Sequence, residues 1–327
     1  MAIFNIIPTS LLILSLFTST TEVNQSETAS LQVSQNVKVT LLSSNLADGP
    51  EVGEWGLSAL VEVDGKCILF DTGRYPETVL RNAETLGIDL SCVTDVVLSH
   101  HHRDHTGGLI TLQEEFRKRN ATAFQRVHVA RGMFFPRLSE SGDVGNPMVE
   151  RKQRLEALGI KFIEYSEPTE IFPGVWVTGP IERTHPEKNY GGSRHVLLDG
   201  DFVEDFIPES QGMTIVTPRG HIVLLGCGHA GIINTLEHIQ AAVAARPIHA
   251  VIGGFHLFSA DDATVEWTAE KLASIGTDNV IGAHCTGIEA LFQLREGANL
   301  NRKTAVVGAV GGSFSFGKGI DPGRLAK

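Results

Sequence analysis

The sequence predicts an α/β protein in which two mixed β-sheets lie face to face with helices on the outside. Two observations lead to this fold class. Both halves of the chain contain runs that alternate apolar and polar residues with a period of two, as half-buried strands do. In the second half, amphipathic segments of helical spacing separate these runs, and such alternation is typical of layered α/β packing.

The first half begins with three strands, expected at residues 37–45, 57–65 and 66–73. Asp64 and Gly65 separate the second strand from the third, and an Asp-Gly pair in this position favours a hairpin. A helix is expected at residues 76–86, with Gly87 as its C-terminal cap, and a short buried strand at 93–99. A helix over residues 108–118 completes this half.

Further strands are expected in the middle region and the second half. Glycine- and proline-containing loops separate the middle strands at 126–130, 161–165 and 175–179. Strands at 213–218 and 221–228 follow, then a helix at 232–245, a strand at 249–255, a helix at 264–276 and a final strand at 279–285. Because no repeat of fixed period or long linker interrupts this series, we expect residues 37–327 to form one domain.

The N-terminal segment differs in kind. Residues 3–17 are almost continuously apolar and residues 18–36 are polar, as in a secretory signal followed by a flexible start. The apolar run is too short for a stable membrane span. Because no Lys or Arg precedes Lys38 and Pro8 interrupts the run, an uncleaved anchor or a fortuitous apolar tail are alternatives. We treat residues 1–36 as signal-like or flexible, and expect a secreted or periplasmic protein, with a cytoplasmic location as the alternative.

Composition narrows the class of partner. With 42% hydrophobic and 20% charged residues, the chain reads as a soluble globular protein. Its formal net charge of −11 argues against nucleic acid as a partner. Four cysteines without a C-x-x-C pair are too few for a disulfide-rich scaffold, and Cys67, in the apolar run KCILF, is expected to be a buried core thiol. The oligomeric state cannot be read from these features.

A histidine-rich stretch directly follows the strand at 93–99. Residues 98–108 read LSHHHRDHTGG, in which His100, His102, Asp104 and His105 form the pattern H-x-H-x-D-H. Imidazole and carboxylate groups are ligands that zinc accepts. On a tight turn, His100 and His102 are expected to share one ion, and Asp104 and His105 to bind a second. The alternative is a solvated loop; the position between a strand and a helix argues against a tag-like tract.

SHHHRDHTGG after a strand resembles the signature of the metallo-β-lactamase superfamily. GLSALVEVDGKCILFDTG, GCGHAGIINTL, IGGFHL and AHCTG resemble, in that order, the branch related to dihydropterin ribofuranosyl-aminobenzene phosphate synthase, and the resemblance covers residues 37–311. It implies a four-layer αβ/βα sandwich, of class α/β (α+β), with metal ions at the edge between the two sheets.

The resemblance also suggests the remaining ligands. His284 in GAHCTG matches the last histidine of the superfamily, a ligand of the second metal ion. For the third ligand of the first ion, His229 in GCGHAG is expected, with a structural role at a helix start as the alternative. His185 in RTHPEK falls where many superfamily members carry this ligand, and is a further alternative.

The chain departs from the superfamily at one position. Where a bridging aspartate is usual, this sequence has Cys227. A thiolate can bind zinc, but Cys227 could equally be a passive small residue beside the site. We expect two zinc ions, the second bound more weakly because a hard carboxylate ligand is lost, with iron or manganese as alternatives.

Other residues are expected around the ions. Asp71 in LFDTG resembles the aspartate that orients metal-bound histidines, with a plain turn residue as the alternative. His256 in GGFHL is expected to donate a proton to a leaving group or to be a packing residue, and Asp104 to orient the nucleophile. Glu54 is expected near the site entrance, and His101 to face solvent or substrate. The other histidines are expected to be ordinary surface or packing residues: His128, His195, His221, His238 and His249.

These features favour a metal-dependent hydrolase whose metal-activated hydroxide attacks an ester, lactone, amide or phosphoester in a small-molecule substrate. The branch leaves a pterin-related synthase as an alternative, and the fold leaves a mononuclear iron oxygenase. Loss of the bridging aspartate leaves a metal- or ligand-binding protein without turnover. Loops within residues 131–210 are expected to set the specificity, and the sequence does not identify the substrate.

Overall fold

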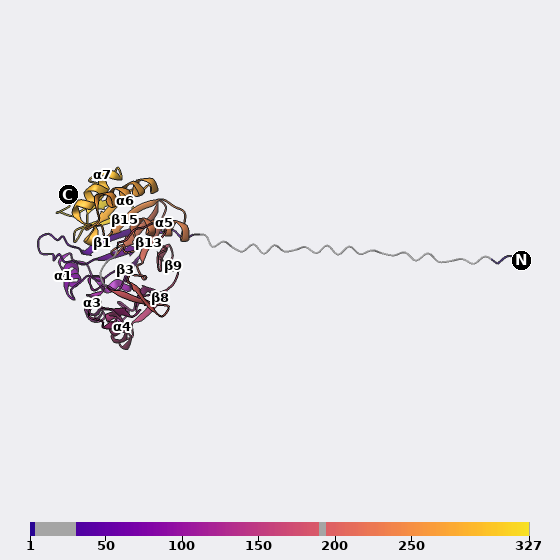
Figure 1. Ribbon diagram of the computed structural model, residues 1–327, viewed down its shortest axis with the longest axis horizontal. Coiled ribbons are helices and arrows are strands. Elements are labelled where there is room, and N and C mark those ends of the chain that lie inside the picture. Colours follow the sequence, from indigo (N-terminus) through magenta and orange to yellow (C-terminus); the bar gives the residue numbers. More distant parts are fainter. Residues whose placement is uncertain (4–30, 190–193, 327) are drawn as a thin grey trace. The chain divides into compact units, whose positions relative to one another are not determined.

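Two β-sheets form the centre of the computed structural model, which describes residues 1–3, 31–189 and 194–326 (Figure 1). The first sheet consists, in spatial order, of β19 (Gly319–Asp321), β18 (Ser313–Ser315), β1 (Val37–Ser43), β2 (Ser58–Val63), β3 (Lys66–Phe70), β4 (Val93–Val97), β5 (Arg126–Ala130) and β8 (Lys161–Tyr165). The second consists of β17 (Ala305–Val307), β16 (Val280–Gly282), β15 (Ile248–Gly253), β14 (Gly220–Leu225), β13 (Gly212–Thr217), β10 (Val175–Val177) and β9 (Thr169–Phe172).

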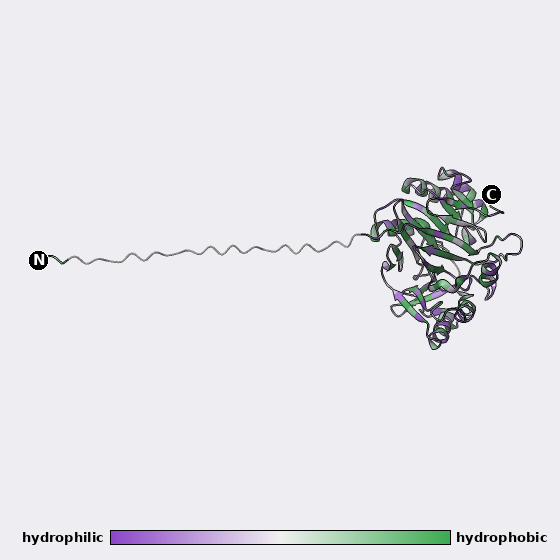
Figure 2. Cartoon of the chain, turned by 180° about the vertical axis from the view of Figure 1, so that it is seen from behind, coloured by the Kyte–Doolittle hydropathy of each residue, from purple (hydrophilic) through white to green (hydrophobic). Residues whose placement is uncertain are grey.

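The inner faces of the two sheets share one hydrophobic core. Val39 and Ile68 from the first sheet lie in the same buried cluster as Ile215 and Ile252 from the second. Because successive side chains of a strand point to opposite faces, the neighbouring apolar residues, such as Leu69, face outward and need a second cover. Figure 2 shows the hydrophobic residues concentrated in these central strands.

Helices provide that cover on both outer faces. On the first sheet lie α1 (Thr78–Thr85), α3 (Leu109–Phe116) and α4 (Pro147–Ala157), which contribute residues such as Leu112 and Leu155 to a second core. On the second sheet lie α5 (Ile232–Ala242), α6 (Asp262–Ile275) and α7 (Ile288–Gly297), with Leu236 and Leu291 in a third core. Figure 1 shows the two sets of helices on opposite sides of the strands. The expected four-layer αβ/βα sandwich is therefore confirmed.

The elements expected from long, regular patterns are present. β2 and β3 form the expected hairpin, in which Val63 pairs with Lys66 across Asp64 and Gly65. The helix expected at 76–86 is α1, and Gly87 after it has a φ of 68°, as a C-terminal capping glycine should. The helices expected at 108–118, 232–245 and 264–276 are α3, α5 and α6.

The strand expected at 279–285 is not the last one. β16 ends at Gly282, and His284–Thr286 form a single 3-10 turn. α7 and three short strands follow, and β18 pairs with β1, so the C-terminal segment returns to the first sheet. Strands of three residues are too short to show a hydrophobic period, which is why the sequence did not reveal them.

The middle region is also richer than expected. It contains α4, whose first turn carries Pro147 and whose N-cap, Asn146, accepts a hydrogen bond from the Met148 backbone N–H. A small antiparallel sheet lies here too, with β12 (Asp201–Glu204), β11 (His195–Leu198), β6 (Arg137–Leu138) and β7 (Val144–Gly145). Neither feature was predicted.

The expectation for Cys67 was wrong. Cys67 forms a disulfide bond with Cys92, with the two Cα atoms 5.7 Å apart. The reason is the register of the parallel pair β3 and β4: Cys67 lies opposite Val93, so the residue that precedes Val93 lies beside it. Cys227 and Cys285 are buried and free.

Gln32–Lys327 form one compact unit. The signal-like segment expected at residues 1–36 falls mostly on residues 4–30, outside the described part of the chain. Within the described part, no helix has the length and apolar character needed to cross a membrane.

Candidate metal centre

The candidate site lies where strands of both sheets end. These strand ends are followed by the residues singled out above: β3 by Asp71, β4 by the segment 100–105, β14 by Cys227 and His229, β15 by His256, and β16 by His284. β3 and β4 are parallel, as are β14, β15 and β16, so in each sheet these ends meet at one edge. The carboxyl ends of parallel strands are the usual place for a site in α/β proteins.

The first donor group consists of His100, His102 and His229, whose candidate ligand atoms all lie within 4.8 Å of one another. His100 Nε2 and His102 Nδ1 are 2.9 Å apart. His229 donates its Nδ1–H to the Asn189 carbonyl over 2.5 Å, which leaves the lone pair on Nε2. That Nε2 is buried and has no hydrogen-bond partner among the described residues, as expected of an atom whose partner is a metal ion.

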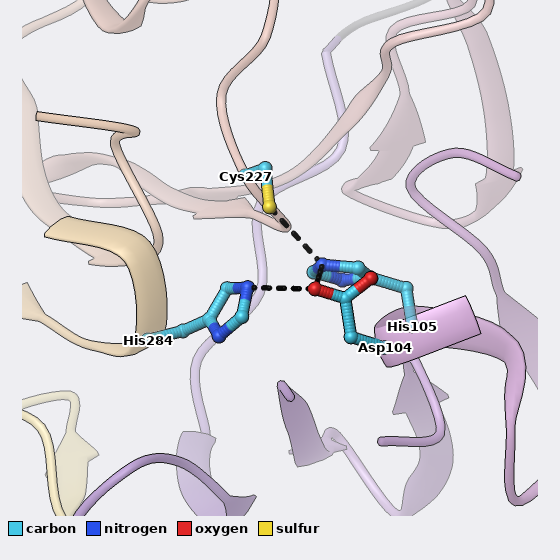
Figure 3. Close-up of side chains that lie close together, drawn as sticks. All are labelled: Asp104, His105, Cys227 and His284. Carbon is cyan, nitrogen blue, oxygen red and sulfur yellow. Dashed lines mark hydrogen bonds and ion pairs between the residues drawn. The ribbon is translucent and has the colours of Figure 1, made fainter. Parts of the chain in front are cut away.

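The second donor group consists of Asp104, His105, Cys227 and His284, again with ligand atoms within 4.8 Å of one another (Figure 3). His105 Nε2 lies 3.1 Å from Cys227 Sγ and 3.8 Å from Asp104 Oδ2. The same carboxylate oxygen lies 3.4 Å from His284 Nε2. Figure 3 shows the carboxylate, the thiol and both rings pointing toward a common centre.

Asp71 connects the two groups. Its Oδ1 accepts a hydrogen bond of 2.7 Å from the Ser99 backbone N–H, and its Oδ2 accepts from Ser99 Oγ and from His105 Nδ1, both at 2.7 Å. Ser99 Oγ in turn accepts from His100 Nδ1 over 2.9 Å. One buried carboxylate thus sets the ring orientation of a histidine in each group, which agrees with the role expected for Asp71.

A glycine makes this arrangement possible. A Cβ atom on Gly226, at the end of β14, would lie 2.0 Å from Ser99 Oγ and 2.8 Å from Asp71 Oδ2. Any side chain at this position would displace the carboxylate. The first glycine of the motif GCGH therefore allows the end of β14, in the second sheet, to pack closely against Ser99 and Asp71 of the first sheet.

The backbone is strained at three residues of the site. Asp71, His256 and His284 have φ values of 55°, 50° and 48°, in the left-handed region that residues other than glycine rarely adopt. Such strain persists only where the surroundings impose it, and it is frequent at functional sites.

The site is arranged to keep most of its imidazoles uncharged. Burial, together with the neighbouring imidazoles, holds the pKa values of His100, His102 and His229 well below the usual range, so all three are neutral at pH 7. Burial also opposes the charging of His105, but the carboxylates of Asp71 and Asp104 raise its pKa to about 9. The three neutral imidazoles form a donor set suited to a divalent cation, whereas His105 carries a proton at pH 7 that a metal ion would have to displace.

A cavity of about 590 Å³ opens at the donor groups. Trp55 and Phe258 line it and contact each other edge to face, with ring centroids 5.3 Å apart. His256 lines the same cavity, and burial lowers its pKa. Its ring lies 4.7 Å from that of His229, but it belongs to neither donor group.

The structure therefore brings together the six residues expected to bind metal, three in one group and three in the other, and adds Cys227 to the second. It places His185 elsewhere: His185 Nε2 lies 2.9 Å from Glu237 Oε2 on α5, and the residue belongs to neither group. Glu54 is buried and accepts hydrogen bonds from Ser43 Oγ and from the Arg74 and Tyr75 backbone N–H groups; it precedes the cavity-lining Trp55 but does not itself line the cavity.

His101 was expected to face solvent or substrate, and it does not face solvent, although it lines a cavity beside the donor groups, so contact with substrate stays a prediction. It is only 7% exposed, and its Nδ1 lies 2.6 Å from Glu209 Oε1. The other oxygen of Glu209 accepts a hydrogen bond from Arg137 Nη2 over 2.6 Å. Glu209 and Arg137 were missed because they lie far away in sequence and in no motif, as was Asn189, which acts through its carbonyl. Ser99, adjacent to the histidine cluster, was the one missed residue that the sequence could have indicated.

Comparisons with known proteins identify the family. A family model described as the metallo-beta-lactamase superfamily matches residues 56–246. A curated protein of Methanocaldococcus jannaschii, named 7,8-dihydropterin-6-methyl-4-(beta-D-ribofuranosyl)-aminobenzene-5'-phosphate synthase, is 32% identical over 266 residues, which are 78% of this chain and 89% of that protein.

Solved structures show the same fold. The crystal structure of Tm1679, described as a metal-dependent hydrolase of the beta-lactamase superfamily, is 28% identical, with a TM-score of 0.66 over 81% of this chain and 94% of that one. Zn²⁺-bound PqqB from Methylobacterium extorquens is 16% identical, with a TM-score of 0.50 over 84% of this chain and 99% of that one.

Proposed function

The chain belongs to the metallo-beta-lactamase superfamily, and from that premise we propose that it is a hydrolase that acts on a small molecule with two bound metal ions. The observation that supports the proposal is the pair of adjacent donor groups at the edge of one cavity. Three imidazoles form the first group, and two imidazoles, a carboxylate and a thiol form the second.

The donor set favours zinc. Imidazole and thiolate ligands suit zinc better than manganese or magnesium, which prefer oxygen ligands. The buried Nε2 of His229, which lacks a hydrogen-bond partner among the described residues, fits this interpretation. When bound in such a site, zinc lowers the pKa of a coordinated water to about 7 and so supplies a nucleophile at neutral pH.

The chain's own residues have separate tasks in this proposal. Asp104 holds the second ion and orients the attacking water, because its carboxylate is the one hard oxygen donor in that group. His256 lies beside the first group and transfers a proton to the leaving group. Since burial lowers its pKa, the ring starts uncharged, so it would first take a proton from the attacking water and then pass that proton to the leaving group. Trp55 and Phe258 bind the apolar part of the substrate.

Metal analysis and a turnover assay on the same samples test the proposal. Protein purified without chelator should contain more than one equivalent of zinc per chain and should hydrolyse generic ester, lactone or phosphodiester substrates. The His102→Ala variant should lose zinc and activity, whereas His195→Ala, at an exposed histidine of β11, should keep both. Protein that binds no metal contradicts the proposal, and protein that binds metal but turns nothing over supports a non-catalytic binding role.

A second candidate is a synthase that joins a pterin to a phosphorylated aromatic partner. The relative of 32% identity favours it, since its name describes such a product. The signal-like N-terminus and the Cys67–Cys92 disulfide favour the hydrolase instead, because pterin intermediates are cytosolic and disulfides persist in oxidising compartments. Incubation with a dihydropterin and ribofuranosyl-aminobenzene phosphate, followed by mass spectrometry, separates the two.

A further inference from the structure

A second cavity, of about 690 Å³, lies next to the donor groups. It shares His102 and Asp104 with the cavity that Trp55 and Phe258 line, so a molecule bound at these two residues can reach into both. The two cavities differ in chemistry. The first has an aromatic wall, whereas three arginines line the second.

These arginines come from three separate parts of the chain. Arg103 belongs to the short helix α2 (Arg103–Thr106), Arg151 to α4, and Arg194 precedes β11. We refer to Arg103, Arg151 and Arg194 as the arginine pocket. Within the described part of the chain, none of the three forms an ion pair with a carboxylate, although Asp104 and Glu140 also line the cavity.

Arg151 is held in place beside the metal-binding segment. Its Nη1 donates hydrogen bonds to the Thr106 carbonyl, over 3.0 Å, and to the Thr106 hydroxyl. Its other guanidinium nitrogens take part in no hydrogen bond within the described residues. Arg103 and Arg151 line the same cavity. Burial and the positive charge of Arg103 lower the pKa of Arg151, which means that the two guanidinium charges repel each other. An anion that bound between them would remove this repulsion.

We propose that the arginine pocket binds a phosphate group of the substrate, while the bond to be broken lies at His102 and Asp104; this rests on the proposed hydrolase function. Arginine presents a planar fork of donors that matches phosphate oxygens. A phosphate group brings close to two negative charges and three acceptor oxygens, against one charge and two oxygens for a carboxylate. Three guanidinium groups that form no ion pair with a carboxylate among the described residues therefore favour phosphate.

The two cavities together define a class of substrate. The phosphate is a recognition group that stays intact, and the remainder of the molecule extends across the donor groups toward Trp55 and Phe258. The substrate is accordingly a phosphorylated small molecule with an apolar or aromatic part, and the hydrolysed bond lies between the two ends.

The test is the binding of inorganic phosphate to zinc-loaded, full-length protein, measured by isothermal titration calorimetry. The double variant Arg103→Gln/Arg194→Gln removes two charges from the pocket and leaves Arg151, which supports Thr106. The matched control Arg119→Gln/Arg154→Gln removes two exposed arginines that pair with Asp89, Glu115 and Glu114 on the surface. Zinc content is measured in every sample, and succinate serves as the comparison ligand.

The pocket variant should bind phosphate at least about tenfold more weakly than the wild type, because each lost charge-assisted hydrogen bond accounts for roughly a factor of ten. The control should bind like the wild type, and succinate more weakly than phosphate. Equal binding by pocket variant and control would place the phosphate on the metal ions and overturn the proposal. Succinate binding as tight as that of phosphate would overturn the choice of phosphate.

Two further results distinguish a failure of the arginine pocket from a failure of the proposed hydrolase function. If the double variant loses zinc, the single variant Arg194→Gln is measured instead. Because Arg194 lies outside the metal-binding segment, this variant should keep its zinc and should bind phosphate several-fold more weakly than the wild type. Wild-type protein that contains zinc and shows turnover, but whose phosphate binding is insensitive to Arg194→Gln, contradicts the arginine pocket alone. Wild-type protein without zinc contradicts the hydrolase.

Discussion

At the scale of single residues, the site depends on side chains that hold the donors rather than on the donors alone. Asp71 supports both donor groups, through Ser99 to His100 and directly to His105. A carboxylate is required because its two oxygens accept three hydrogen bonds and donate none.

Asp71→Asn tests this role. The amide keeps one acceptor oxygen and places an NH₂ group against a donor, so His105 and Ser99 lose part of their support. We expect zinc affinity to fall by about 10–100-fold, measured by competition with a chromophoric chelator. The control is Asp89→Asn, at an exposed aspartate that accepts from the Ser91 N–H. Unchanged zinc retention in Asp71→Asn would show that the hydrogen bonds do not position the donors.

Cys227 gives a second prediction at this scale, because a thiolate has its own spectroscopic signature. Protein loaded with cobalt should show a sulfur-to-metal charge-transfer band in the near ultraviolet. That band should vanish in Cys227→Ser and persist in Cys285→Ser, because Cys285 is buried nearby but belongs to neither donor group. A band that survives in Cys227→Ser would make Cys227 a passive residue, which is the alternative that the sequence left open.

The residues that the sequence identified share one property: they stand within motifs, directly after a strand. The pattern H-x-H-x-D-H, the motifs around His229 and His284, and Asp71 all lie at such strand ends. The sequence could not indicate hydrogen bonds between residues that lie far apart along the chain. Nothing in its local pattern indicates that Glu209 binds His101, or that Asn189 fixes His229 through a backbone carbonyl.

At the scale of elements, patterning predicts those strands and helices that are long enough to show a period. β13 and β14 were found because six buried residues in succession are unmistakable. β17, β18 and β19 were not, because three residues do not define a period. Their pairing is specified by the neighbouring strands, which is a tertiary effect that no local reading of the chain can supply.

β4 and β5 carry an ion network that makes a prediction about pH. Asp95 on β4 is buried, and it accepts two hydrogen bonds of 2.6 Å from Arg126 and one of 2.8 Å from His128, both on β5. Burial opposes the ionisation of Asp95, but the hydrogen bonds from His128 and Arg126 outweigh it and lower its pKa to about 2.

Because this pKa is lower in the folded protein than the ordinary value near 4, ionised Asp95 stabilises the fold above about pH 4, and the contribution is lost as the pH falls toward 2. The size of the effect is about 2 kcal/mol. Urea unfolding between pH 2 and 7 should show this loss of stability in the wild type. In Asp95→Asn the free energy of unfolding should fall less steeply as the pH is lowered. Asp201→Asn, at an exposed aspartate of β12, should follow the wild type. If the stability of Asp95→Asn fell as steeply at acid pH as that of the wild type, other carboxylates would be responsible for the acid sensitivity.

At the scale of the whole molecule, function arises from the meeting of the two sheets. His100, His102, Asp104 and His105 follow a strand of the first sheet, whereas Cys227, His229 and His284 follow strands of the second. Each donor group contains residues from both, so neither group exists until the sandwich has closed. The αβ/βα architecture could be predicted from the sequence because the histidine motif and the strand pattern agree on it.

The Cys67–Cys92 disulfide is the whole-molecule feature that the sequence reading missed, and it favours the proposed export. Closing a loop with a sequence separation of 25 residues should stabilise the fold by about 3 kcal/mol through the entropy of the unfolded chain. Cys67→Ala/Cys92→Ala should therefore lower the free energy of unfolding by that amount and the thermal midpoint by roughly 5–10 °C. Reductant should destabilise the wild type similarly and leave the variant unchanged.

Alkylation and mass spectrometry of protein taken from its native compartment complete the test: two free thiols, Cys227 and Cys285, are expected, together with an N-terminus that begins after the apolar segment. Four free thiols and an intact N-terminus would place the protein in a reducing cytoplasm and contradict export.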